Sequence, residues 1–228
     1  MTSLQLFRLG GLGLLAGAFT WTIHIVLRSI ITAGADPATL YQEGLWTPIN
    51  LLGVIGAILL LLGLPALYAY IAGPTGWLGL LGMVLIALAW MFFGFFLSLF
   101  SVLVAPWLAE QAPELIAGAS LPSGFLIAFI VGLLAELVGA VLLAIPFVRG
   151  RVSPRWVGYL LPAAALLTVV GNLIAPSGPA SNLAINLFSN LGPVLLAIAF
   201  AYLGFRMWVQ PVQATNLELP DDYVHGAA

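Results

Sequence analysis

Residues 48–100 decide the fold, and they read PINLLGVIGAILLLLGLPALYAYIAGPTGWLGLLGMVLIALAWMFFGFFLSLF. Two apolar runs stand on either side of a short break at residues 72–76, which contains two glycines and a proline. Each run exceeds the roughly 20 residues that a helix needs to cross the hydrocarbon core of a bilayer. Neither run alternates apolar and polar residues with a period of two, which argues against a β-barrel. The stretch therefore predicts two transmembrane helices joined by a tight turn.

The composition of the whole chain agrees with this interpretation. Of its 228 residues, 62% are hydrophobic and only 6% are charged, and the mean hydropathy is +1.15. Soluble domains carry about 25% charged residues, so both a soluble and a disordered protein are excluded. The net charge of -2 provides no basic surface for a nucleic acid. The absence of cysteine excludes disulfides, thiolate metal sites and cysteine nucleophiles.

We predict an all-α fold, a polytopic membrane helical bundle whose six transmembrane helices span about residues 6–31, 48–71, 76–100, 124–148, 155–174 and 183–208. Clusters of Gly, Pro and polar residues separate these segments. Residues 1–208 form one transmembrane domain, and residues 209–228 form a short acidic cytoplasmic tail. Motifs shared by alternate helices are compatible with three related hairpins.

The arginines indicate the orientation of the bundle. Cytoplasmic loops of membrane proteins carry an excess of Arg and Lys. With both termini in the cytoplasm, only Arg28 falls on the outer side. The arginines on the inner side are then Arg8, Arg149, Arg151, Arg155 and Arg206. The pattern therefore predicts that the N- and C-termini are both cytoplasmic.

The predicted hairpin between the second and third helices resembles a known group of proteins. Its residues 62–68 read LGLPALY and its residues 72–82 read AGPTGWLGLLG. This hairpin is similar to one in uncharacterised bacterial six-helix integral membrane proteins. The resemblance covers the hairpin only and carries no catalytic motif. It implies a multi-pass protein of the bacterial inner membrane and implies no activity.

Glu136 is an ionisable residue at the centre of the predicted helix 124–148. A carboxyl group in hydrocarbon is costly, so such a residue marks a candidate site. Small residues surround it at helical spacing, and these are Ala128, Gly132, Gly139, Ala140 and Ala144. Because small residues let another helix approach closely, we expect Glu136 to face the bundle and to bond with Thr20, His24 or a polar group of the sixth helix. It either binds a proton or cation or fixes helix packing.

A polar line runs along the first helix, where Thr20, His24 and Arg28 recur every four residues. Residues at this spacing share one face of a helix. His24 either packs or binds a ligand, and Arg28 either attracts an anionic group or extends to the lipid headgroups. Since His225 is the only other histidine and lies in the tail, no haem or other cofactor and no metal site is predicted.

Asparagines gather toward the same predicted outer side of the membrane. Asn182, Asn186 and Asn190 follow a four-residue spacing in the outer half of the sixth helix. Asn50 and Asn172 lie at the outer ends of the second and fifth helices. Together with the polar line of the first helix, they suit an outward-facing pocket for a small molecule. They equally suit interhelical hydrogen bonds worth about 0.6 kcal/mol each.

These observations lead to two functional hypotheses. The first is a non-enzymatic accessory or scaffolding subunit of a larger membrane assembly. Its Gly/Ala helix faces would pack against partner subunits or a second copy of the chain. Gly13 and Gly17 of the first helix form a G-x-x-x-G pair, which predicts a tight-packing surface. The alternative is a small carrier or ligand-binding membrane protein that uses the outward-facing polar pocket. An enzyme is not favoured, because the chain has no phosphate-binding loop, no paired carboxylates and no metalloprotease motif.

Overall fold

The computed structural model describes residues 3–113, 115, 123–152, 154–174 and 181–209, and all regular structure in this part of the chain is helical. Six helices are long and apolar enough to cross a membrane, and they cover Leu4–Thr32, Trp46–Gly73, Thr75–Gln111, Ser123–Val148, Arg155–Leu173 and Leu191–Val209. The predicted all-α membrane bundle is confirmed. The predicted tail lies outside the described residues except for Val209. The orientation in the membrane and the three related hairpins stay predictions.

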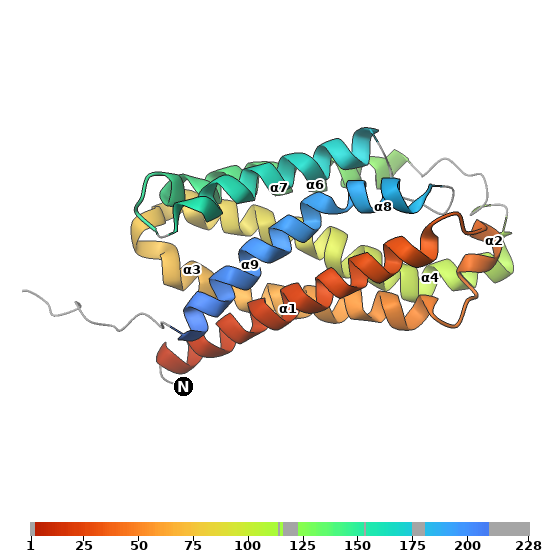
Figure 1. The fold of residues 1–228 in the computed structure, drawn as a ribbon, viewed down its shortest axis with the longest axis horizontal. Coiled ribbons are helices and arrows are strands. Elements are labelled where there is room, and N and C mark those ends of the chain that lie inside the picture. The colour runs from red at the N-terminus through yellow and green to blue at the C-terminus, as the bar shows by residue number, and fades with distance from the viewer. Residues whose placement is uncertain (1–2, 114, 116–122, 153, 175–180, 210–228) are drawn as a thin grey trace, which may run out of the picture.

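The helices are α1 (Ser3–Thr32), α2 (Pro37–Leu40), α3 (Trp46–Trp90), the π-helix η1 (Met91–Phe96), α4 (Leu97–Gln111), α6 (Ser123–Val148), α7 (Arg155–Ile174), α8 (Leu183–Ser189) and α9 (Leu191–Val209). The long helices lie side by side, with α2, α8 and the end of α4 gathered at one end of the bundle (Figure 1). We call this the α2 end. The N-terminus and the turn between α6 and α7 lie at the opposite end (Figure 1).

The predicted turn after the second span lies inside α3. Gly76 has φ 58° and ψ -152°, so its backbone leaves the helical region and reverses the chain. Residues with a Cβ rarely adopt a positive φ, which explains why glycine occupies the turn. The two spans of α3 therefore form the hairpin that residues 48–100 predict.

The third span is longer than the prediction of 76–100. It continues through η1 and α4 to Gln111 and includes Pro106. A proline cannot donate a backbone hydrogen bond, so the sequence predicts that the helix ends before Pro106. The helix nevertheless continues, because Ala105 and Ala109 are buried against the bundle. The Trp46 indole also donates a 2.7 Å hydrogen bond to the Ser101 carbonyl.

The predicted helix 183–208 is interrupted. Asn190 has φ -94° and ψ 1° and separates α8 from α9. Pro193 explains the interruption, because it has no N–H to offer the Ser189 carbonyl four residues earlier and its ring would crowd that carbonyl. The predicted sixth helix is therefore divided into the short helix α8 and the spanning helix α9, which meet near the α2 end.

Glycines set the distances between neighbouring helices. Gly17 of α1 faces the backbone of Gly56 in α3, and a Cβ on Gly17 would come 2.9 Å from the Gly56 carbonyl oxygen. Gly11 and Gly204 join α1 to α9 with the same closeness, at 2.6 Å from Cβ to carbonyl oxygen. Apolar side chains gain little by leaving lipid for one another, so such close backbone packing is a main source of stability in the membrane. The predicted tight face of Gly13 and Gly17 thus packs inside the bundle.

The two ends of the bundle are filled differently. Away from the α2 end, the interior is closed by large apolar side chains that are almost completely buried. They include Leu67, Ile71, Phe147, Val157, Leu203 and Met207. The buried polar side chains His24, Ser29, Asn50 and Asn186 lie in the other half. The interior is therefore apolar at one end and polar at the other, as the sequence indicates.

Candidate functional site

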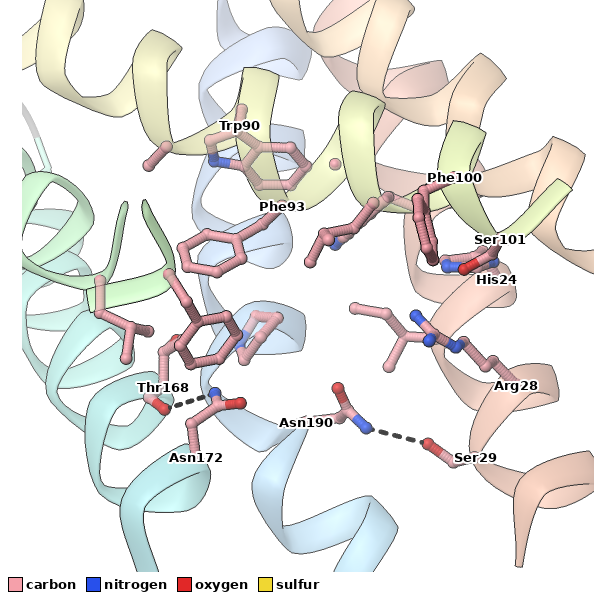
Figure 2. A pocket seen from close by; sticks show the side chains of 18 of the residues that line it. His24, Arg28, Ser29, Trp90, Phe93, Phe100, Ser101, Thr168, Asn172 and Asn190 are labelled. Atoms are coloured by element: carbon pink, nitrogen blue, oxygen red, sulfur yellow. Dashed lines mark hydrogen bonds between the residues drawn. The ribbon is translucent and has the colours of Figure 1, made fainter. Parts of the chain in front are cut away.

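A cavity of about 620 Å³ lies inside the bundle, between its middle and the α2 end. Its polar lining consists of His24, Arg28, Ser29, Thr32, Tyr41, Ser101, Glu136, Thr168, Asn172 and Asn190. Its aromatic lining consists of Trp21, Trp46, Trp90, Phe93, Phe100, Phe125 and Phe129. Figure 2 shows the aromatic rings of Trp90 and Phe93 on one side, with Arg28 and His24 on another. Pockets of 300–1,000 Å³ with an apolar lining and few polar groups are typical of small-molecule sites.

Arg28 provides the positive charge of the cavity. Its guanidinium carbon lies 5.8 Å from the centre of the Trp46 ring, a distance at which a cation is attracted to the ring face. Among the described residues, no carboxylate forms an ion pair with Arg28. Arg28 therefore lines the cavity with no carboxylate paired to it in the described part of the chain.

Tyr41, in the turn after α2, lies close to Arg28. Burial raises the pKa of the Tyr41 phenol above its ordinary value, and the positive charge of Arg28 opposes this shift. The phenol consequently keeps its proton at neutral pH and can donate a hydrogen bond. Tyr41 and Arg28 together present two donors to an anionic group at this end of the cavity.

His24 is almost fully buried and is fixed by the backbone of α3. Its Nδ1 lies 2.8 Å from the Ile49 carbonyl oxygen. Because a carbonyl can only accept, Nδ1 carries a proton, and Nε2 of a neutral ring is an acceptor. A Cβ at Gly53 would come 2.9 Å from Nε2 and 2.6 Å from the Ser98 hydroxyl, so Gly53 provides the space for both groups. In the part of the chain that the structure describes, no three potential ligands gather into a metal site.

Two tryptophan side chains in the lining of the cavity carry buried hydrogen-bond donors. Trp21 and Trp90 pack against each other with their ring centres 5.1 Å apart. Both indole N–H groups are buried and have no hydrogen-bond partner among the described residues. Leaving a buried donor unsatisfied costs about 1–3 kcal/mol.

Glu136 points into the bundle, as predicted, and is only 6% exposed. Its partner is the Thr168 hydroxyl of α7, so the prediction of Thr20, His24 or the sixth helix is wrong. The reason lies in the packing, because α6 contacts α7 along its length and α1 lies across the cavity. The second carboxyl oxygen, Oε1, is buried and has no partner among the described residues.

The predicted asparagines divide into two groups. Asn190 and Asn172 line the cavity, and their amide groups donate to Ser29 Oγ at 3.2 Å and to the Thr168 carbonyl at 2.8 Å (Figure 2). Asn186 is buried outside the cavity lining and donates to the Ser29 carbonyl at 3.2 Å and to Thr32 Oγ1 at 3.1 Å. Asn186 thus holds α8 against α1.

We expect Asn186→Ala to lower the free energy of unfolding by about 1–2 kcal/mol, because both bonds to α1 are lost at about 0.6 kcal/mol or more each. Denaturant unfolding in detergent, followed by circular dichroism, measures the change. Leu187→Ala on the same helix is the matched control, since Leu187 is 43% exposed. Equal losses in the two variants would contradict the role given to Asn186.

Thr20 and Asn50 do not line the cavity. Asn50 is buried and donates to the Trp46 carbonyl within its own helix, at 2.8 Å. On α1 the lining positions are 21, 24, 25, 28, 29 and 32. Each residue of a helix is rotated by about 100° around the helix axis from the one before it. Residues four positions apart are therefore offset by about 40° around the axis, and Thr20 lies off the face that lines the cavity. Residue 21 stays on the lining face because a spacing of seven residues nearly closes two turns.

Comparisons with protein-family models, curated proteins and solved structures find no match for this chain. The resemblance of residues 62–82 to uncharacterised bacterial membrane proteins therefore stays a prediction. The function has to be argued from the geometry of the cavity.

Proposed function

We propose that this integral membrane protein binds a small anionic molecule with an apolar body in the cavity at the α2 end. The observation that carries the proposal is the Arg28 guanidinium, which lines the cavity without an ion-pair partner among the described residues. The Arg28 side chain is only partly buried, and its positive charge attracts an anion. An anionic ligand would supply that partner and would accept a hydrogen bond from Tyr41.

The remainder of the cavity supports a ligand of mixed character. The neighbouring indole rings of Trp21 and Trp90 line the cavity with aromatic surface. Phe93, Phe100 and Phe129 provide further apolar contact area. A ligand with one charged group and an apolar body would match both kinds of surface.

A carrier is the form of this function that the irregular helices favour. Substrate sites of many carriers lie beside interrupted helices, whose freed backbone groups help to bind the substrate. One of the six spans is irregular beside this cavity, at η1, and the sixth span begins beside it directly after the break at Asn190. Phe93 and Gly94 of η1 and Asn190 itself belong to the lining. We therefore extend the proposal to movement of the ligand across or within the membrane.

We expect 2-naphthoate to bind to the purified protein in non-ionic detergent and 2-naphthamide, its neutral analogue, to bind at least about tenfold more weakly. Arg28→Gln should lower the affinity for 2-naphthoate by about ten- to a hundredfold, because a hydrogen bond to a charged group contributes about 1.5–3 kcal/mol. Binding to 2-naphthamide should change little. Quenching of tryptophan fluorescence measures both affinities.

The matched control is Arg149→Gln, since Arg149 is exposed in the turn at the opposite end of the bundle. This variant should bind 2-naphthoate as the unchanged protein does. If Arg28→Gln and Arg149→Gln retain equal affinity for 2-naphthoate, or if the unchanged protein does not bind it, the proposed function is wrong.

The accessory or scaffolding role expected from the sequence stays a prediction. Partner subunits, or a second copy of the chain, would have to contact the apolar outer faces of the helices. Purification in mild detergent without a stoichiometric partner would contradict that role and would leave the ligand-binding proposal intact.

A further inference from the structure

The wall of the cavity beside η1, α4 and α6 is formed by side chains and not by closely packed helix backbones. α6 packs closely on the first turns of the third span. A Cβ at Gly139 of α6 would come 2.9 Å from the Gly82 carbonyl oxygen of that span. Toward the α2 end the two helices diverge, and α4 keeps its close contacts with α3 and η1 (Figure 1). Between η1 and α6, aromatic side chains make the contact.

Four phenylalanines form this bridge. Phe92 of η1 meets Phe125 of α6 with ring centres 6.0 Å apart, and Phe93 meets Phe129 at 5.3 Å with nearly perpendicular rings. We call these two pairs the phenylalanine seam. Aromatic pairs of this geometry contribute only about 0.5–1.5 kcal/mol each beyond the area that they bury, so the rings can separate at a modest cost.

The cavity reaches the outer surface of the bundle at the phenylalanine seam. Leu126 lines the cavity and is also 49% exposed. Phe96, which stacks on Phe92 with ring centres 5.8 Å apart, is 47% exposed beside it. In a membrane, these apolar surfaces face lipid. Among the described residues, a single layer of side chains therefore separates the cavity from lipid here.

The π-helix places the phenylalanines at this position. η1 covers Met91–Phe96 and widens the third span by its extra residue per turn. Within it, Gly94 lies against α3, where an added Cβ would come 2.9 Å from Ala57 Cβ. Gly94 therefore anchors one side of η1, and Phe93 on the other side reaches α6. Single-turn π-helices inside longer helices are frequent at functional sites.

We propose that the ligand is an anionic amphiphile with one hydrocarbon chain, and that it enters from the bilayer by parting the phenylalanine seam. This inference rests on the proposed function, because Arg28 is the site of the anionic group. Arg28 lies four residues from the α2 end of Leu4–Thr32, and Phe129, which meets Phe93, lies six residues from the same end of Ser123–Val148. The phenylalanine seam is therefore slightly further from the α2 end than the anionic group would be. The hydrocarbon chain of the ligand then runs from Arg28 past the indole rings of Trp21 and Trp90 and leaves the bundle between η1 and α6.

The test uses the fact that the chain has no cysteine. Leu126→Cys and Leu134→Cys lie on the same helix, and their native side chains are 49% and 54% exposed, but only position 126 lines the cavity. Each variant is measured before and after labelling with N-cyclohexylmaleimide. The probe is cis-parinaric acid, an 18-carbon carboxylate whose polyene chain accepts energy from tryptophan.

We expect labelled Leu126→Cys to bind cis-parinaric acid at least about tenfold more weakly than its unlabelled form, because each buried methylene contributes about 0.8 kcal/mol. Labelled Leu134→Cys should change less than about twofold. Binding of 2-naphthoate, which has no chain, should be unchanged by either label. The methyl ester of the probe should bind weakly to all forms, because it lacks the anionic group.

Equal affinity of the two labelled variants for cis-parinaric acid would overturn the lateral path. If 2-naphthoate still bound through Arg28 in that case, the proposed function would stand and only the amphiphile would be wrong. Phe129→Ala gives an independent measurement, since removal of one ring of the phenylalanine seam should speed the association of cis-parinaric acid several-fold. A rate unchanged from that of the native protein would also count against the inference.

Discussion

Replacing Gly192 with valine is expected to lower the free energy of unfolding by about 3 kcal/mol. A Cβ at this position would come 2.3 Å from the Thr168 backbone nitrogen, 2.5 Å from Thr168 Oγ1 and 2.5 Å from the Ala164 carbonyl oxygen. Two of these atoms are backbone atoms that cannot rotate away, so α7 and α9 would have to separate. The change would also displace Thr168 from Glu136 and so disturb the cavity.

Gly124→Val is the matched control for this prediction. Gly124 and Gly192 are both the second residue of a helix, in α6 and α9. A Cβ at Gly124 meets no described atom within 4 Å. We expect this variant to change the free energy of unfolding by no more than about 0.5 kcal/mol. Denaturant titration in detergent compares the two, and equal stabilities would contradict the close contact between α7 and α9.

The spans could be predicted because lipid imposes a simple requirement on the sequence. Every backbone polar group must be bonded inside the segment that crosses the hydrocarbon, so each span becomes a continuous apolar run. The beginnings and ends of the helices were therefore close to the prediction except where prolines occur. Pro106 lies inside a helix that continues, whereas Pro193 lies just after an interruption at Asn190. Local sequence does not distinguish these outcomes, because neighbouring helices decide whether a freed carbonyl finds a partner.

The charged members of the candidate site were also visible in the sequence. Arg28, His24 and Glu136 stand out because ionisable groups are rare in spanning helices. The aromatic members, such as Trp21 and Trp90, do not stand out, because the same residues commonly pack against lipid. Their role depends on the 5.1 Å approach of two rings from separate helices. The seven-residue spacing between Trp21 and Arg28 indicates that both lie on one face of α1 and could have predicted Trp21 as a lining residue. The four-residue spacing of Thr20, His24 and Arg28 pointed to Thr20 instead.

We expect Glu136→Lys to lower the free energy of unfolding by about 3 kcal/mol, the cost commonly found for a basic residue at the centre of a spanning helix. Glu136→Gln should change it by less than about 1 kcal/mol. The Thr168 hydroxyl donates its only proton to the Ala164 carbonyl at 3.1 Å. Its oxygen can therefore accept a hydrogen bond from the side chain at position 136. A glutamine amide can donate this bond as a carboxylic acid does, without bringing a charge.

The glutamine variant also separates a structural from a functional carboxyl group. If Glu136 only fixes the packing of α6 on α7, Glu136→Gln should bind 2-naphthoate and move it into liposomes as the native protein does. If the carboxyl group carries a proton during transport, uptake into liposomes should be lost while binding and stability are kept, since an amide cannot release a proton at neutral pH. Oε1, buried at the cavity and without a partner among the described residues, favours the second outcome. A Glu136→Lys protein as stable as the native one would show that Glu136 is not enclosed by the bundle, and both interpretations would then be wrong.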